Sequence, residues 1–132
     1  MSLRSPLARA LGSGSAKEGV AHWWTQRLTA AALVPLSIWF LAGLLSLHSL
    51  DYATVRGWLT QPLNTMTALL LTLVLVWHSS LGVQVVIEDY VHHEKLKIAS
   101  LLLVRFAHAV LAVAGVYAIS MIAFAATPGV PS

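Results

Sequence analysis

The chain alternates between long apolar segments and short charged ones. Three segments contain no Asp, Glu, Lys or Arg, namely residues 28–50, 57–87 and 106–132. Each can hold the ~20 apolar residues that a membrane-spanning helix needs. The pattern therefore predicts an all-α membrane protein with three transmembrane helices. We expect these helices at about residues 26–47, 64–90 and 98–125.

The segments outside these helices differ in character. Residues 1–21 are polar and basic, so we expect an N-terminal arm followed by the three-helix anchor of residues 22–132. The arm lacks the short apolar core of a secretory signal. Between the first two helices, residues 51–59 are expected to form a short interfacial helix. Pro35 lies inside the first expected helix and should kink it mildly.

Composition narrows the function classes. Charged residues make up 10% of the chain, whereas a soluble domain carries about a quarter. The formal net charge of +3 does not indicate nucleic-acid binding, because the basic residues do not form a patch rich in aromatic and turn residues. The chain has no cysteine, which excludes iron–sulfur ligation and thiolate metal sites within it.

The basic residues predict the orientation. Only Arg56 lies on the side of the first interhelical loop, and the other basic residues lie at the N-terminal arm and near the loop between the second and third helices. The latter are Arg4, Arg9, Lys17, Arg27, Lys95, Lys97 and Arg105. By the positive-inside rule, we expect a multi-pass protein of the inner (cytoplasmic) membrane with a cytoplasmic N-terminus and a periplasmic C-terminus.

His78 is the polar residue placed deepest in the second expected helix. It lies 11 residues before Asp89, about 16 Å at 1.5 Å per residue. A neutral imidazole in hydrocarbon needs a partner, and two interpretations stay open: a hydrogen bond to a neighbouring helix, or axial ligation of a haem iron. Gly82, one turn further on, leaves room for a flat macrocycle or for another helix.

Asp89 and Tyr90 follow where the apolar run meets water. Asp89 is rotated about 20° from His78, so both face the same side of the helix at different depths. A tyrosine at this depth is typical of an aromatic membrane anchor. Its phenol can also donate a hydrogen bond to a quinone carbonyl, with the neighbouring aspartate orienting it.

The other histidines are alternatives. His108 lies about ten residues into the third expected helix, near the depth of His78, so the two histidines could bind one haem within this chain. His22, His48, His92 and His93 are expected near the membrane surfaces. Those on the cytoplasmic side could relay protons to a quinone, although solvation is the commoner fate of such histidines.

Two motifs carry a family resemblance. The first reads His78-x3-Gly82-x-Gln84-Val85-Val86-x2-Asp89-Tyr90-Val91-His92, and the second reads Gly14-Ser15-Ala16-Lys17-x-Gly19 followed by His22-Trp23-x2-Gln26-Arg27-x-Thr29. Together they resemble the small hydrophobic membrane-anchor subunit of succinate dehydrogenase (succinate:quinone oxidoreductase, respiratory complex II), in its α-proteobacterial and mitochondrial-like branch. The resemblance covers most of the chain.

The resemblance implies a role for each matching residue. His78 matches the axial ligand to the iron of haem b, whose second ligand is a histidine of the other membrane-anchor subunit. Tyr90 matches the tyrosine that hydrogen-bonds ubiquinone, and Asp89 matches its neighbour. Arg27 matches an arginine of the haem-propionate and quinone region, where His22 is a further candidate. The three helices would then form half of a six-helix heterodimeric anchor bundle.

The resemblance also implies the partners and the reaction. A flavoprotein subunit would oxidise succinate on FAD, and an iron–sulfur subunit would pass electrons to ubiquinone at the membrane. This chain would tether them and would not oxidise succinate itself. Three alternatives stay open: a self-contained dihistidine cytochrome b using His78 and His108, the anchor of a quinol:fumarate reductase, and a purely structural membrane adaptor.

Overall fold

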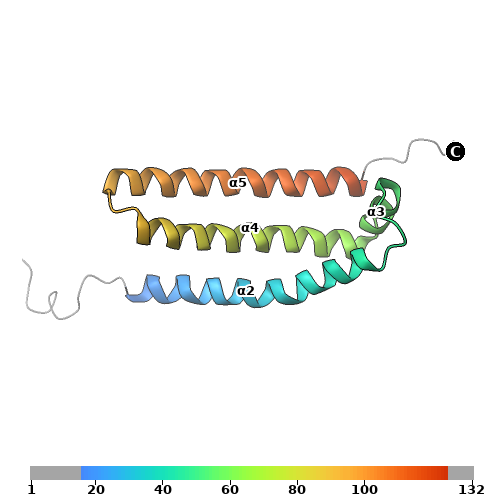
Figure 1. Cartoon of the computed structure of the whole chain (residues 1–132), viewed down its shortest axis with the longest axis horizontal. Coiled ribbons are helices and arrows are strands. Elements are labelled where there is room, and N and C mark those ends of the chain that lie inside the picture. The colour runs from blue at the N-terminus through green and yellow to red at the C-terminus, as the bar shows by residue number, and fades with distance from the viewer. Residues whose placement is uncertain (1–15, 125–132) are drawn as a thin grey trace, which may run out of the picture.

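The structure is a computed structural model that describes residues 16–124, all but a few of them helical (Figure 1). The helices within this range are α2 (Ala16–Leu45), α3 (Tyr52–Leu59), α4 (Pro62–Tyr90) and α5 (Glu94–Phe124). Three of them, all but α3, are long and apolar enough to cross a membrane. The expected all-α class with three transmembrane helices is therefore confirmed, and the expected short helix between the first two is α3.

All three long helices begin earlier than the charge pattern predicts, although α4 begins only two residues earlier, at Pro62. α2 begins at Ala16 instead of about residue 26, so the end of the expected N-terminal arm is helical, while residues 1–15 of that arm lie outside the described residues. α5 begins at Glu94 instead of about residue 98. Apolar runs mark the part of a helix that fits lipid, whereas Glu and Lys are good helix formers that continue the helix into water.

α4 is the central helix. It packs against α2 on one side and α5 on the other, as Figure 1 shows, and α3 lies across the end where α2 finishes and α4 begins. The opposite end of the bundle therefore brings together the start of α2, the end of α4 and the start of α5. We call this opposite end the Tyr90 end, after the last residue of α4.

Close contacts fix the corner at α3. The Trp58 ring stacks on Trp39 of α2 with the ring centroids 5.3 Å apart. A Cβ added to Gly43 would lie 2.5 Å from the Trp58 ring, so only glycine lets α2 approach α3 this closely. The Asn64 side-chain amide donates to the Trp58 carbonyl oxygen at 2.8 Å, which joins α3 to the start of α4. These contacts make the corner the most buried part of the described chain.

Elsewhere the long helices leave their apolar side chains uncovered. Within residues 19–124, the buried residues are Leu59, Asn64, Thr65 and Ala68, all at the junction of α3 and α4. Leu28 of α2 and Phe106 of α5 are each 71% exposed. Apolar faces of this extent suit lipid or neighbouring transmembrane helices, not water.

Two local features shape the bundle. α2 is bent in its second half (Figure 1), and Pro35 is the proline inside it, in agreement with the expected kink. A Cβ added to Gly115 of α5 would lie 2.7 Å from the Thr72 methyl group of α4. The α4–α5 packing therefore depends on a glycine at this position.

Candidate functional site

His78 of α4 faces α2. Its Nδ1 atom lies 2.9 Å from the hydroxyl oxygen of Thr29, which bridges the two helices. Within residues 19–124, the other ring nitrogen, Nε2, makes no hydrogen bond. His78 is half-buried, so one nitrogen is anchored inside the chain while the other is free to meet a group outside it.

Gly82, one turn along α4, has open space beside it. A Cβ built on Gly82 meets no other atom within 4 Å. Both uses of this glycine that the sequence allowed, room for a flat macrocycle and room for another helix, therefore stay predictions, and no helix in the described part of this chain fills the space beside Gly82.

Thr29 belongs to one of the two sequence motifs, but its contact with His78 was not predicted, because α2 begins earlier than expected. From an expected start at residue 26, Thr29 would lie only about 5 Å into the helix. Counted from Ala16 it lies 13 residues in, about 20 Å, and His78 lies 12 residues before Tyr90, about 18 Å. Two polar residues at equal depth on antiparallel helices are the signal that would have found the pair.

Tyr90 and Asp89 lie at the end of α4, beside the turn into α5. Tyr90 is 77% exposed, and Asp89 is exposed as well. In the described part of the chain, neither side chain has a hydrogen-bond partner. Both polar groups therefore face outward, about 18 Å along α4 from His78.

Arg27 and His22 lie on different faces of α2. Arg27 is rotated about 200° from Thr29, so it points away from α4, and its guanidinium lies 5.1 Å from the centre of the Trp23 ring. His22 is rotated only about 20° from Thr29 and faces α4; its Nε2 is buried without a partner among residues 19–124. The chain by itself does not bring these two residues together.

Arg27 is also distant from Tyr90. The contact between Thr29 and His78 fixes the register of α2 against α4. In that register, the Cα atom of Arg27 lies about 15 Å short of Tyr90 along the bundle axis, near the level of His78. In depth, the Cα atom of Arg27 is thus much closer to His78 than to Tyr90.

His108 of α5 is held from both sides. Its Nδ1 lies 2.8 Å from the Val104 carbonyl oxygen, and its Nε2 lies 3.3 Å from the Ser79 hydroxyl. Ser79 follows His78 on α4 and is rotated 100° from it, toward α5 instead of α2. His108 and His78 therefore project to different sides of α4.

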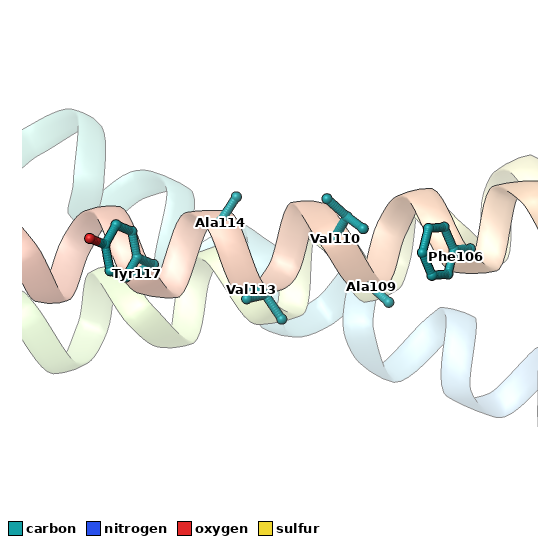
Figure 2. A pocket seen from close by; sticks show the side chains of 6 residues that line it. All are labelled: Phe106, Ala109, Val110, Val113, Ala114 and Tyr117. Atoms are coloured by element: carbon teal, nitrogen blue, oxygen red, sulfur yellow. The ribbon is translucent and has the colours of Figure 1, made fainter.

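Hollows lie along α5 within the described residues, and two of them adjoin the middle of that helix. The first, about 590 Å³, runs between α4 and α5 and is lined by residues that include Trp77, Gln84, Arg105 and His108. The second, about 470 Å³, is a shallow depression on α5 alone, where Ala109 and Val113 lie between Phe106 and Tyr117 (Figure 2). Neither contains His78 or Tyr90, so the expected site residues lie outside both hollows.

Comparison with known protein families gives a match over nearly the whole chain. The family model of the succinate dehydrogenase/fumarate reductase transmembrane subunit matches residues 1–126. The chain belongs to this family. As a member it is a multi-pass membrane protein, in agreement with its three long apolar helices.

Three of the similar curated proteins each match two thirds or more of this chain. The succinate dehydrogenase hydrophobic membrane anchor subunit of Rickettsia bellii is 38% identical over 94 residues, which are 71% of this chain and 75% of the relative. The membrane anchor subunit of Reclinomonas americana is 35% identical over 92 residues (67% and 77%). That of Paracoccus denitrificans is 30% identical over 116 residues (88% and 89%). These matches confirm the resemblance drawn from the motifs.

No solved structure gives a significant match. In this member of the transmembrane-subunit family, residues 16–124 contain no cluster of three or more His, Asp or Glu side chains that could hold a bare metal ion.

Proposed function

We propose that this chain is a membrane-anchor subunit of succinate:ubiquinone oxidoreductase. It tethers the succinate-oxidising subunits to the membrane, supplies His78 as one axial ligand of haem b, and contributes Tyr90 and Asp89 to the ubiquinone site. Electrons pass from succinate to ubiquinone, so the chain acts as a subunit of an enzyme of the tricarboxylic acid cycle and the respiratory chain without oxidising succinate itself.

The observation that carries the haem assignment is the state of the His78 ring. Nδ1 is bonded to Thr29 inside the chain, and Nε2 has no hydrogen bond among residues 19–124. Histidines that ligate metals commonly bind with one nitrogen while the other is held by a hydrogen bond. A histidine that served only to link two helices would not need its second nitrogen left open.

The surroundings of His78 fit a flat cofactor. The side of α4 at Gly82 is open, and a side chain there would occupy space that a macrocycle needs. Arg27 lies near the level of His78 and carries a guanidinium suited to bind a propionate carboxylate, but it projects from the face of α2 turned away from α4, so it would meet the haem only beyond the immediate surroundings of His78. Haem b, when bound, would supply a one-electron redox centre, and His78 would hold it, with Arg27 and His22 as further candidates.

The quinone assignment depends on the outward-facing end of α4. The Tyr90 hydroxyl is a hydrogen-bond donor with no partner among the described residues, and Asp89 beside it is exposed. A ubiquinone headgroup needs a polar contact at the membrane surface, while its tail stays in lipid. Tyr90 would donate to a quinone carbonyl, and Asp89 would orient the phenol.

The proposed partners are inferred from the cluster ligands that this chain lacks and from the apolar helix faces that it exposes. It has no cysteine for iron–sulfur clusters, so these belong to the iron–sulfur partner, and FAD belongs to the flavoprotein partner. The uncovered faces of the long helices suit a second membrane-anchor chain, lipid and ubiquinone. That second anchor chain would complete a six-helix bundle and supply the other haem ligand. The inner membrane, with the Tyr90 end cytoplasmic and the α3 end periplasmic, is the proposed location.

The single-chain dihistidine cytochrome is less well supported. His108 uses both ring nitrogens within the chain, and it approaches α4 through Ser79, away from the side on which His78 meets α2. The anchor of a quinol:fumarate reductase belongs to the same family. Measuring succinate oxidation and fumarate reduction by the purified complex would separate that enzyme from the proposed one.

Purification of the complex through a tag on this chain tests the proposal. We expect FAD, iron–sulfur clusters and a second three-helix subunit to copurify, with a haem b signal in the reduced-minus-oxidised spectrum. His78→Ala should abolish or greatly weaken that signal while FAD still copurifies. An assembled complex with no haem in the parent protein, or full haem in His78→Ala, would contradict the ligand assignment and favour a structural adaptor.

A further inference from the structure

The hydroxyl of Thr29 has three oxygen or nitrogen neighbours but only one proton. Its oxygen lies 2.9 Å from the Thr25 carbonyl oxygen, 3.0 Å from the Gln26 carbonyl oxygen and 2.9 Å from His78 Nδ1. Carbonyl oxygens only accept hydrogen bonds. The hydroxyl proton therefore points toward the two carbonyls, since any other direction would set oxygen lone pairs against each other at under about 3 Å.

This arrangement decides which nitrogen of His78 carries the proton. With its own proton directed at the α2 backbone, the Thr29 oxygen can only accept from Nδ1. Nδ1 is then the protonated nitrogen, and a neutral imidazole protonated there presents a lone pair at Nε2. The chain thus presents His78 in the one neutral form that can bind iron through Nε2.

We propose that Thr29 is the positioning residue of the haem ligand. Its oxygen accepts from His78 Nδ1–H while its own proton is donated to the α2 backbone carbonyls, and this fixes the Nδ1–H tautomer and holds the ring at one angle. This inference depends on the proposed haem function. It adds to the haem site a residue of α2, Thr29, which would influence the iron only through His78.

The hydrogen bond also affects the electronic character of the ligand. Donation from Nδ1–H makes the imidazole a stronger electron donor at Nε2, which favours the ferric over the ferrous state. Loss of the Thr29 oxygen should therefore raise the haem midpoint potential and weaken haem binding by about 10- to 100-fold, the usual range for such outer partners. A residue that only packed α2 against α4 would not shift the potential.

α2 offers a matched control one turn away. Thr25 makes the same kind of bond within its helix, from its hydroxyl to the Ala21 carbonyl oxygen at 2.8 Å, but its side chain makes no hydrogen bond to His78. Thr25→Val therefore removes a hydroxyl from the same helix and the same backbone pattern. Any general effect of deleting a threonine hydroxyl from α2 will appear in this variant too.

The experiment uses the intact complex with Thr29→Val, Thr29→Ala, Thr29→Ser and Thr25→Val. The readouts are the haem-to-FAD ratio, the rate at which haem transfers to excess apomyoglobin, and the haem midpoint potential. We expect faster haem loss and a raised potential in Thr29→Val and Thr29→Ala, and values close to the parent protein in Thr29→Ser and Thr25→Val. The Ala and Ser variants differ by one oxygen atom, so they decide the matter even if the valine variant does not assemble.

The outcomes separate this inference from the function on which it depends. If Thr29→Ala matches Thr29→Ser in potential and in rate of haem loss, Thr29 does not position the ligand. If His78→Ala keeps its haem, the haem assignment itself fails. Loss of haem in His78→Ala together with a Thr29→Ala complex that behaves like Thr25→Val would overturn only the role of Thr29.

Discussion

His108 and Ser79 are joined across α4 and α5, with 3.3 Å between Nε2 and the hydroxyl oxygen. The Nδ1 of the same ring lies 2.8 Å from the Val104 carbonyl oxygen, which can only accept, so Nε2 is the acceptor for Ser79. Both ring nitrogens of His108 are therefore used within this chain, and neither is left to bind haem as the single-chain cytochrome would require. The bond to Ser79 gives His108 a structural role between two helices.

Replacement of His108 should therefore spare the haem. His108→Ala removes one interhelical hydrogen bond, worth about 0.6 kcal/mol on average in membrane proteins, and should leave the haem-to-FAD ratio of the complex unchanged. His78→Ala, measured in parallel, should lose the haem. Haem loss from an otherwise assembled His108→Ala complex would favour the single-chain dihistidine cytochrome.

Removal of the Tyr90 hydroxyl should slow quinone reduction without harming the fold. Tyr90 is 77% exposed and its hydroxyl has no partner in residues 19–124, so Tyr90→Phe removes no contact of this chain. Loss of a hydrogen bond to a reacting quinone oxygen should lower the rate of ubiquinone reduction about 10- to 100-fold. Succinate oxidation by an artificial acceptor that bypasses the quinone site should stay intact.

Tyr52 provides the control for that experiment. It is 71% exposed and lies at the start of α3, at the opposite end of the bundle. Tyr52→Phe should keep both activities. If Tyr90→Phe lost both activities equally, the variant would have an assembly defect and the quinone role of Tyr90 would lose its support.

The α4–α5 contact at Gly115 should not tolerate a side chain. Because an added Cβ would lie 2.7 Å from the Thr72 methyl group, Gly115→Ala forces either a rotation of Thr72 or a shift of α5. Overpacking of this kind costs about 1–3 kcal/mol, which should appear as a lower melting temperature of the detergent-solubilised complex. Gly57→Ala, at a position with nothing within 4 Å, is the control.

A second substitution should relieve the Gly115→Ala defect. Thr72→Ser removes the methyl group in question but keeps the hydroxyl that donates to the Ala68 carbonyl oxygen at 2.9 Å. The double variant should recover most of the lost thermal stability. If Thr72→Ser gave no rescue, the strain would lie elsewhere in the helix pair.

Asp51 should cap the N-terminus of α3 at every pH at which its carboxyl group is ionised. The Ser49 hydroxyl, followed by the Thr54 backbone N–H and hydroxyl, lowers the pKa of the Asp51 carboxyl from its ordinary value. The folded state thus favours the carboxylate, so its contribution is complete above about pH 4 and is lost as the pH falls through the lowered pKa.

Amide exchange measures this cap directly. The Thr54 N–H donates to the Asp51 carboxylate at 3.0 Å, so Asp51→Ala should speed hydrogen–deuterium exchange in the α3 peptide at neutral pH. Asp51→Asn keeps an acceptor and should retain most of the protection. Protection of the parent protein, corrected for intrinsic exchange, should be constant from about pH 5 to pH 8. Equal exchange in all three proteins would show that Asp51 does not cap α3.

The sequence alone determined the class and the family, and it predicted the residues of the candidate site. Long segments without charge have few solutions other than transmembrane helices, because a charge is costly in hydrocarbon and a spanning backbone must satisfy its own hydrogen bonds. The spacing from His78 to Asp89 follows from the rise and rotation of one helix, so no tertiary information was needed to place these two residues on one face at different depths.

The tertiary structure decided what lies beside each residue. The charge pattern marked where α2 becomes apolar but not where it begins, and this error concealed the partner of His78 at Thr29. The register between antiparallel helices, which placed Arg27 near the level of His78 and turned His108 toward Ser79, depends on packing between side chains distant in sequence. Periodicity along one helix gives each residue a face and a depth, but only packing between helices determines which face it meets.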